Sequence, residues 1–247
     1  MSKTLLLSIY KNFLREKITV LILVILPLIL ILTATATVPD QTTIVILEGK
    51  IIDPQPNAKA LAVVVNALTA VAMVTSITAF FANIQLRKVK PRLEIMGYSS
   101  RQISTTFILF ATGISILTSV AIYSLSLIWF TPYNSLGFFS TLIIGSLLFS
   151  TTGLVLSTLI KSRELGLYLL LTIVILDVAF LEHPFYSRQY DNSALIVMPG
   201  HYVIRMVFRA AFKTGKIWIQ YLPHVILYEL FLFLLLILVT KLTSKKG

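Results

Sequence analysis

Six apolar runs divide the chain, and they constrain its fold more than any other feature. Each reaches or approaches the ~20 residues that a helix needs to cross the hydrocarbon core of a membrane. The runs span residues 18–37, 58–84, 104–130, 136–160, 165–181 and 221–240. The sequence therefore predicts an all-α membrane protein, a single transmembrane domain over residues 1–247 with six transmembrane helices.

Composition agrees with this prediction. Apolar residues make up 57% of the chain and charged residues only 13%, whereas a soluble domain is about a quarter charged. The net charge of +11 is split among short segments beside the apolar runs and forms no basic stripe, which excludes nucleic acid as the expected partner. The absence of cysteine excludes disulfides and thiolate chemistry.

The N-terminal segment, residues 2–17, is expected to form an amphipathic helix on the inner leaflet. Apolar side chains share one of its faces, and basic and polar side chains lie elsewhere. The first apolar run follows directly. An alternative interpretation is a signal peptide, because Ala34-Thr35-Ala36 has the form of a cleavage site.

A basic segment, Leu86 to Arg101, separates the second and third apolar runs. Short basic segments stay on the cytoplasmic side of a membrane. This places both termini of a multi-pass protein of the plasma (inner) membrane in the cytoplasm, and most other lysines and arginines agree. Pro91 is expected to start a new segment there, in which residues 92–95 form a short helix that Gly97 ends.

The fourth apolar run carries small residues at helical spacing, which let two helices approach closely. They are Ser146, Ser150, Gly153 and Ser157. Packing within one subunit is the simpler interpretation, and a contact between two subunits is the alternative.

Two acids lie inside apolar runs, Asp177 in the fifth and Glu229 in the sixth. Acids in such positions are costly and suggest function by default. One interpretation is proton coupling. The favoured one is structural: both acids pair with Arg205, Arg209 or a tyrosine hydroxyl, and this charged belt closes the outer end of the transport path. Those arginines belong to a predicted interfacial helix over residues 202–213, a short helix before the last span.

Motifs of catalysis are missing. The chain has no G-x-x-x-x-G-K-[ST] phosphate loop, so it is not expected to bind ATP itself. It also lacks the G-x-S-x-G and H-E-x-x-H motifs of hydrolases and metalloproteases. The three histidines, His183, His201 and His224, lack metal-site spacing. No catalytic residue, metal or cofactor is therefore assigned to this chain, and it is not expected to be an enzyme.

The order of these features resembles the membrane subunits of type-2 ATP-binding-cassette (ABC) exporters over nearly the whole chain. The shared features are the amphipathic N-terminal helix, six spans, the basic elbow and short helices before the last span. Pro199-Gly200-His201-Tyr202, with Arg209 after it, looks like the family's Pro-x-x-Tyr and later arginine. The chain departs from the family at Gly97-Tyr98-Ser99-Ser100, where acidic residues and a proline are frequent.

The resemblance implies partners. A separate ATPase subunit would bind ATP and Mg, and a second copy of this chain or a related permease would complete the transporter in the lipid bilayer. The elbow that couples to the ATPase would comprise Arg92, Leu93, Glu94, Ile95, Met96, Gly97, Tyr98 and Arg101. The transport path would be lined by Asn66, Thr69, Met73 and Ser76 of the second span.

Such a path suits an amphiphilic cargo, either lipid-like, peptide or drug-like, that moves out of the cytoplasm. Two other classes of function stay open. One is a proton-coupled secondary transporter that uses Asp177 and Glu229. The other is a non-transporting immunity or assembly component of the membrane.

Overall fold

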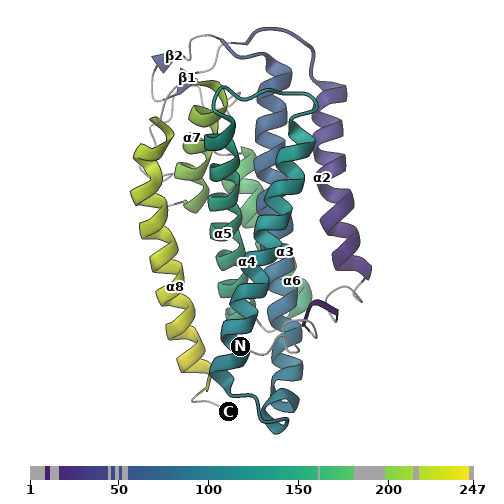
Figure 1. Ribbon diagram of the computed structural model, residues 1–247, viewed down its shortest axis with the longest axis vertical. Coiled ribbons are helices and arrows are strands. Elements are labelled where there is room, and N and C mark those ends of the chain that lie inside the picture. Colours follow the sequence, from purple (N-terminus) through teal and green to yellow (C-terminus); the bar gives the residue numbers. More distant parts are fainter. Residues whose placement is uncertain are drawn as a thin grey trace.

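The protein is an elongated bundle of helices (Figure 1). Its computed structural model describes residues 9–11, 17–43, 46–47, 50–51, 55–160, 162–180, 198–213 and 217–244. The turn between α3 and α4 lies at one end of the bundle, which we call the basic end because residues 87–101 surround it. The small strand pair of β1 (Ile46–Leu47) and β2 (Lys50–Ile51), which is antiparallel, lies at the opposite end.

Helix α3 (Ala58–Ile95) is the centre of the bundle. Its 38 residues extend over about 57 Å at 1.5 Å per residue. Asn57 caps its first turn by accepting a hydrogen bond from the Lys59 N–H at 2.8 Å. Apart from Asn66, every side chain from Leu61 to Ala82 is buried, as expected for a helix that is apolar on all faces.

The other helices surround α3. They are α2 (Lys17–Thr37), α4 (Ser100–Ser126), α5 (Ser135–Leu159), α6 (Arg163–Val174), α7 (Pro199–Phe212) and α8 (Leu222–Ser244). Helix α6 continues as a π-helix, η1 (Ile175–Phe180), and a 3₁₀ helix, η3 (Ile217–Tyr221), precedes α8. Among the described helices, α3 and α5 make the most extensive contact with each other (Figure 1).

The expectation of an all-α membrane protein agrees with this architecture. Four helices of the described part are long and apolar enough to cross a membrane: α3, α4, α5 and the segment Trp218–Thr240 that ends in α8. The first and fifth apolar runs form α2 and the α6–η1 pair. The complete six-span topology stays a prediction.

The predicted break at Pro91 is wrong. Pro91 lies inside α3, which continues past the predicted end at residue 84 to Ile95. A proline removes one N–H from the helical ladder, at the carbonyl of Arg87. Arg87 and Pro91 are both exposed residues near the end of the helix, where a missing hydrogen bond costs less than in a buried helix interior. Residues 92–95 are therefore the last turn of α3 and not a separate short helix.

The helix predicted over residues 202–213 forms as α7. Of the two surroundings expected for its apolar side, lipid or protein, the structure shows protein, because its apolar residues are buried against the bundle. Its location at a membrane interface stays a prediction. Val203, Met206 and Ala210 are fully buried, and Ile204, Val207 and Phe208 nearly so. Helix α7 lies beside α5 and α8 in the upper half of Figure 1. The amphipathic pattern correctly identified a one-sided helix, but α5 and α3 cover its apolar side.

The small residues of α5 pack within the subunit, as the simpler interpretation predicted. A Cβ atom on Gly153 would lie 2.2 Å from the carbonyl oxygen of Ser76 on α3. Four residues further on, the Ser157 hydroxyl accepts a 2.7 Å hydrogen bond from the Asn83 side chain. The absence of a side chain at residue 153 thus lets α3 and α5 approach to backbone contact.

The predicted amphipathic helix over residues 2–17 lies mostly outside the described residues. Residues 9–11 are helical. The Tyr10 ring meets the Phe110 ring of α4 edge to face, with centroids 4.8 Å apart. This contact fixes the start of the described chain against the basic half of the bundle.

Helix α8 is the least covered of the long helices and lies at the edge of the bundle (Figure 1). Large apolar side chains such as Leu227, Phe231 and Leu234 are more than half exposed. An apolar surface of this extent needs lipid or another protein around it. It is the surface expected of a membrane-embedded helix.

Candidate functional site

The turn between α3 and α4 is fixed by backbone hydrogen bonds. Gly97 has a φ of +89°, in the region that glycine adopts without steric cost. The Gly97 N–H donates to the Glu94 carbonyl at 3.0 Å, and the Tyr98 N–H donates to the Leu93 carbonyl at 3.1 Å. This pair of bonds is a Schellman motif. The prediction that Gly97 ends the helix is confirmed.

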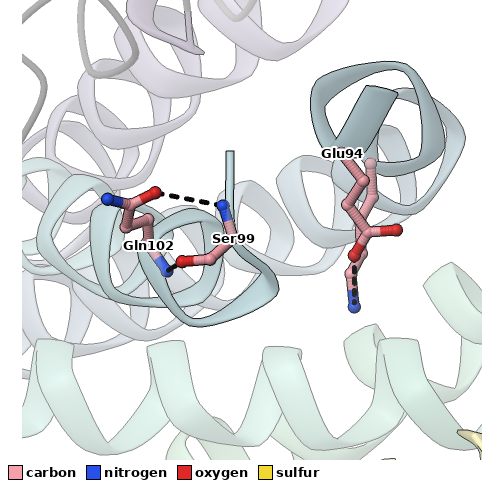
Figure 2. Close-up of polar contacts among 4 residues, drawn as sticks. Glu94, Ser99 and Gln102 are labelled. Atoms are coloured by element: carbon pink, nitrogen blue, oxygen red, sulfur yellow. Dashed lines mark hydrogen bonds and ion pairs between the residues drawn. The ribbon is translucent and has the colours of Figure 1, made fainter. Parts of the chain in front are cut away.

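Helix α4 begins directly after this turn with a capping box (Figure 2). The Ser99 hydroxyl accepts a hydrogen bond from the Gln102 N–H, while the Gln102 side chain accepts one from the Ser99 N–H at 3.0 Å. Nearby, Lys90 and Glu94 form an ion pair with 3.8 Å between Nζ and Oε1. Caps on both helices hold the four-residue connection in one conformation.

The turn exposes two large apolar side chains. Ile95 is 86% exposed and Met96 is 74% exposed. Leu93 and Tyr98, in contrast, pack against a buried apolar cluster that includes Phe107 of α4. The charged elbow residues Arg92, Glu94 and Arg101 are exposed. The predicted elbow thus presents a small apolar tip with charges around it.

The predicted path residues lie on the central helix. Thr69, Met73 and Ser76 are buried within the subunit, and Asn66 is half-buried. The Thr69 hydroxyl donates to the Val65 carbonyl and the Ser76 hydroxyl to the Met73 carbonyl, both within α3. Since these polar groups are satisfied by their own helix, they cost little inside an apolar bundle. Their role in a path stays a prediction.

Asp177 is fully buried in the π-helical turn η1. Its Oδ2 atom accepts a 2.7 Å hydrogen bond from the N–H of Gly200, the second residue of α7. The positive end of the helix dipole and its unpaired N–H groups stabilise a carboxylate at this position. A Cβ atom on Gly200 would lie 2.7 Å from three atoms of the carboxyl group, so only glycine admits this approach.

Aromatic rings cover the same end of α7. The Tyr202 ring stacks on the His224 ring of α8 with centroids 4.6 Å apart, and it also contacts the rings of Tyr221 and Tyr228. Tyr228 lies within electrostatic reach of Asp177. This cluster joins α7, η3 and α8.

Glu229 is the second acid that lies inside an apolar run. Its Oε1 atom accepts a 2.6 Å hydrogen bond from the hydroxyl of Thr151 on α5. Its Oε2 atom is buried and has no hydrogen-bond partner among the described residues. A half-satisfied buried carboxyl group costs stability. Its position between α5 and α8 is therefore difficult to explain by folding alone.

The two predicted arginine partners lie on α7 and are half-buried. The guanidinium carbon of Arg209 lies 4.9 Å from the centroid of the Tyr221 ring, a cation–π contact. Asp177 accepts a hydrogen bond from Gly200, and Glu229 accepts one from Thr151. The pairing of either acid with Arg205 or Arg209 stays a prediction.

Histidines and acids do not gather into a metal site in the described part of the chain. His201 is buried with its ring edge-on to Tyr202, and His224 stacks on the same tyrosine. His183 lies outside the described residues.

Sequence reasoning did not predict the contacts of the two acids with Gly200 and Thr151. Thr151 is 78 residues from Glu229, and Gly200 is 23 residues from Asp177. The proline-glycine pair at the start of α7 is a local signal for a helix N-terminus. That signal identifies a position that favours an acid, although it does not say which acid occupies it.

No protein-family model and no curated protein matches this chain.

Proposed function

We propose that this chain is the membrane subunit of an ATP-driven exporter of the type-2 ABC class. It acts with a separate ATPase subunit, which binds ATP and Mg, and with a second copy of itself or a related permease. The cargo is amphiphilic: a lipid-like molecule, a peptide or a drug-like compound. The membrane is the plasma (inner) membrane, with both termini in the cytoplasm.

The observation that carries the proposal is the tip between α3 and α4. Ile95 and Met96 are exposed there, although the turn itself is fixed by two sets of caps. An exposed apolar pair on a rigid support suits contact with a soluble partner. Helix α3 then runs unbroken from the tip to Ala58 at the opposite end, so a displacement of the tip acts on the whole bundle.

Two further features support a partner that supplies the energy. The sequence has no phosphate-binding loop of its own. The basic residues around the tip follow the distribution of cytoplasmic segments, where an ATPase has access to ATP.

The test is gentle extraction of the tagged full chain from its own cells, followed by identification of the proteins that co-purify and measurement of MgATP hydrolysis. We expect an ATPase subunit with the wild-type chain and its loss from the double variant Ile95→Asp, Met96→Asp. Ile128→Asp is the matched control, because Ile128 is 66% exposed in the turn at the opposite end. Equal retention of the ATPase in both variants would contradict docking at the tip.

A proton-coupled secondary transporter is the second candidate, favoured by the burial of Asp177 and the half-satisfied carboxyl group of Glu229. In this case the purified chain in vesicles would transport in response to a pH gradient without any ATPase, and Glu229→Gln would abolish that transport. Gradient-independent transport that needs MgATP would exclude it.

A further inference from the structure

A cavity of about 440 Å³ lies between α3, α4, α5 and α8. Its volume is within the ~300–1,000 Å³ typical of sites for small molecules. None of the residues that the sequence assigned to a transport path lines it. Its walls are formed by Asn83, Leu86, Arg87, Lys90, Ile103, Ser104, Phe107, Ile108, Leu154, Thr158, Phe233, Leu236, Ile237 and Thr240.

The lining is amphiphilic. Most of the wall is apolar, with side chains such as Phe107, Leu154 and Phe233. Polar groups gather toward the basic end, where Ser104 lies in the first turns of α4 and Thr240 in the last turns of α8. This is the arrangement of a headgroup and an acyl chain in one leaflet of a bilayer.

The charge of the lining has one sign. Among the described residues that line the cavity, Arg87 and Lys90 are the cations and none is an acid. The Arg87 guanidinium donates one hydrogen bond to the Ser157 carbonyl and has further N–H groups to donate. Lys90 pairs with Glu94 on the exposed surface, and such a pair is weak enough to leave the ammonium group able to bind an anion.

The cavity is reached from the side of the bundle. Ile108, Phe233 and Ile237 line it and are each about two-fifths exposed. They belong to α4 and α8, two helices with large apolar exposed surfaces. A ligand that enters between them comes from the apolar phase around the bundle.

We propose that this cavity is a binding site for an anionic acyl lipid of the leaflet at the basic end. The acyl chain lies along Phe107, Leu154 and Phe233, and the anionic headgroup contacts Arg87 and Lys90. Charge complementarity and lateral access favour a lipid over a segment of another protein. The proposal is independent of the ATPase partner, since it needs only the contacts within this chain.

The test uses tryptophan as a reporter in the full chain reconstituted into vesicles. Phe233→Trp places the reporter in the cavity wall. Phe231→Trp is the matched control, on the same helix and 60% exposed but outside the cavity. The quencher is a phospholipid brominated on its acyl chains, either phosphatidylglycerol or phosphatidylcholine, at equal mole fractions in a phosphatidylcholine bilayer. The signal of the unchanged chain is subtracted.

We expect quenching of the Phe233→Trp reporter to show that the cavity binds phosphatidylglycerol about fivefold more strongly than phosphatidylcholine. This is the factor expected from one basic side chain beside an anionic lipid. Phe231→Trp should respond to the two headgroups alike. Adding Lys90→Gln, which changes an exposed side chain, should reduce the preference of the cavity reporter.

A steric variant provides an independent arm. Ser104→Phe fills the cavity from an exposed position, whereas Thr105→Phe adds the same ring at the neighbouring exposed position that does not line it. Only Ser104→Phe should lower the quenching of the cavity reporter. The proposal would be overturned if both lipids quenched Phe231→Trp and Phe233→Trp equally. It would also be overturned if Ser104→Phe left the quenching of the cavity reporter unchanged, because the quenching would then come from bulk lipid or the cavity would hold another occupant.

Discussion

The N–H of Gly200 donates a 2.7 Å hydrogen bond to Oδ2 of Asp177, and this bond joins η1 to the first turn of α7. The acid is fully buried, and the glycine has no side chain to separate the two groups. A charge that the apolar run itself cannot accommodate is thus placed at the positive end of another helix. The geometry explains why an acid is tolerated there.

This relationship makes the two residues interdependent. Gly200→Ala should lower the free energy of unfolding of the detergent-solubilised chain by about 1–3 kcal/mol, because the added methyl group meets the Asp177 carboxyl group. The measurement is thermal unfolding. In an Asp177→Ala background the same change should cost clearly less. Equal costs in the two backgrounds would show that the glycine is needed for another reason.

Glu229 and Thr151 offer a second pair for a double-mutant cycle. Thr151→Val should destabilise the chain by about 1–3 kcal/mol, because the buried carboxyl group loses its described donor. In a Glu229→Leu background the cost should nearly vanish. The measurement is thermal unfolding of all four forms. If Thr151→Val destabilised the chain equally in both backgrounds, the threonine would stabilise the fold through contacts other than the one with Glu229.

Glu229→Gln separates charge from shape at the same position. The amide oxygen still accepts the Thr151 hydrogen bond, so the folded state should persist with equal or greater stability. If the acid belongs to a gate, transport by the variant becomes leaky while it stays insensitive to a proton gradient. The check is a transport assay in vesicles with the gradient imposed and then collapsed.

Backbone contact between α3 and α5 predicts an asymmetry between two glycines. Gly153→Ala should destabilise the bundle strongly, by about 3 kcal/mol or more, because its Cβ meets the Ser76 carbonyl and neither backbone can move freely. Gly113→Ala is the control, since among the described residues its Cβ meets a side-chain atom, the Tyr10 hydroxyl at 2.8 Å, and no backbone. Similar thermal stabilities of the two variants would argue against rigid packing here.

The α3–α4 turn can be tested through Gly97. A Cβ at this position meets none of the described residues within 4 Å, so the expected effect of substitution arises from the positive φ. Gly97→Val should cost about 1–2 kcal/mol, whereas Gly97→Asn should be tolerated better. Where the tip transmits force, Gly97→Val also uncouples MgATP hydrolysis from transport. Normal coupling in a well-expressed valine variant would make the tip a passive loop.

Local features were readable from the sequence. The apolar runs became helices, Gly97 ended α3, and the small residues of α5 marked a close approach. Each of these depends on hydropathy or backbone preference within a few residues. The wrong prediction of a helix break at Pro91 has the same origin. Proline breaks a helix in its interior, but it is tolerated in an exposed turn near the end of a helix.

The burial of α7 and the partners of the acids were decided by the tertiary structure alone. An amphipathic pattern shows that a helix has an apolar side, but not whether lipid or α5 covers it. Thr151 meets Glu229 only because α5 and α8 lie together with one particular rotation about their axes. Likewise, Arg87 and Phe233 share a cavity through the packing of four helices. The sequence by itself determined which segments are helices and that Gly97 ends α3. The order and rotation of those helices, set by side-chain packing over long separations, decided which residues meet.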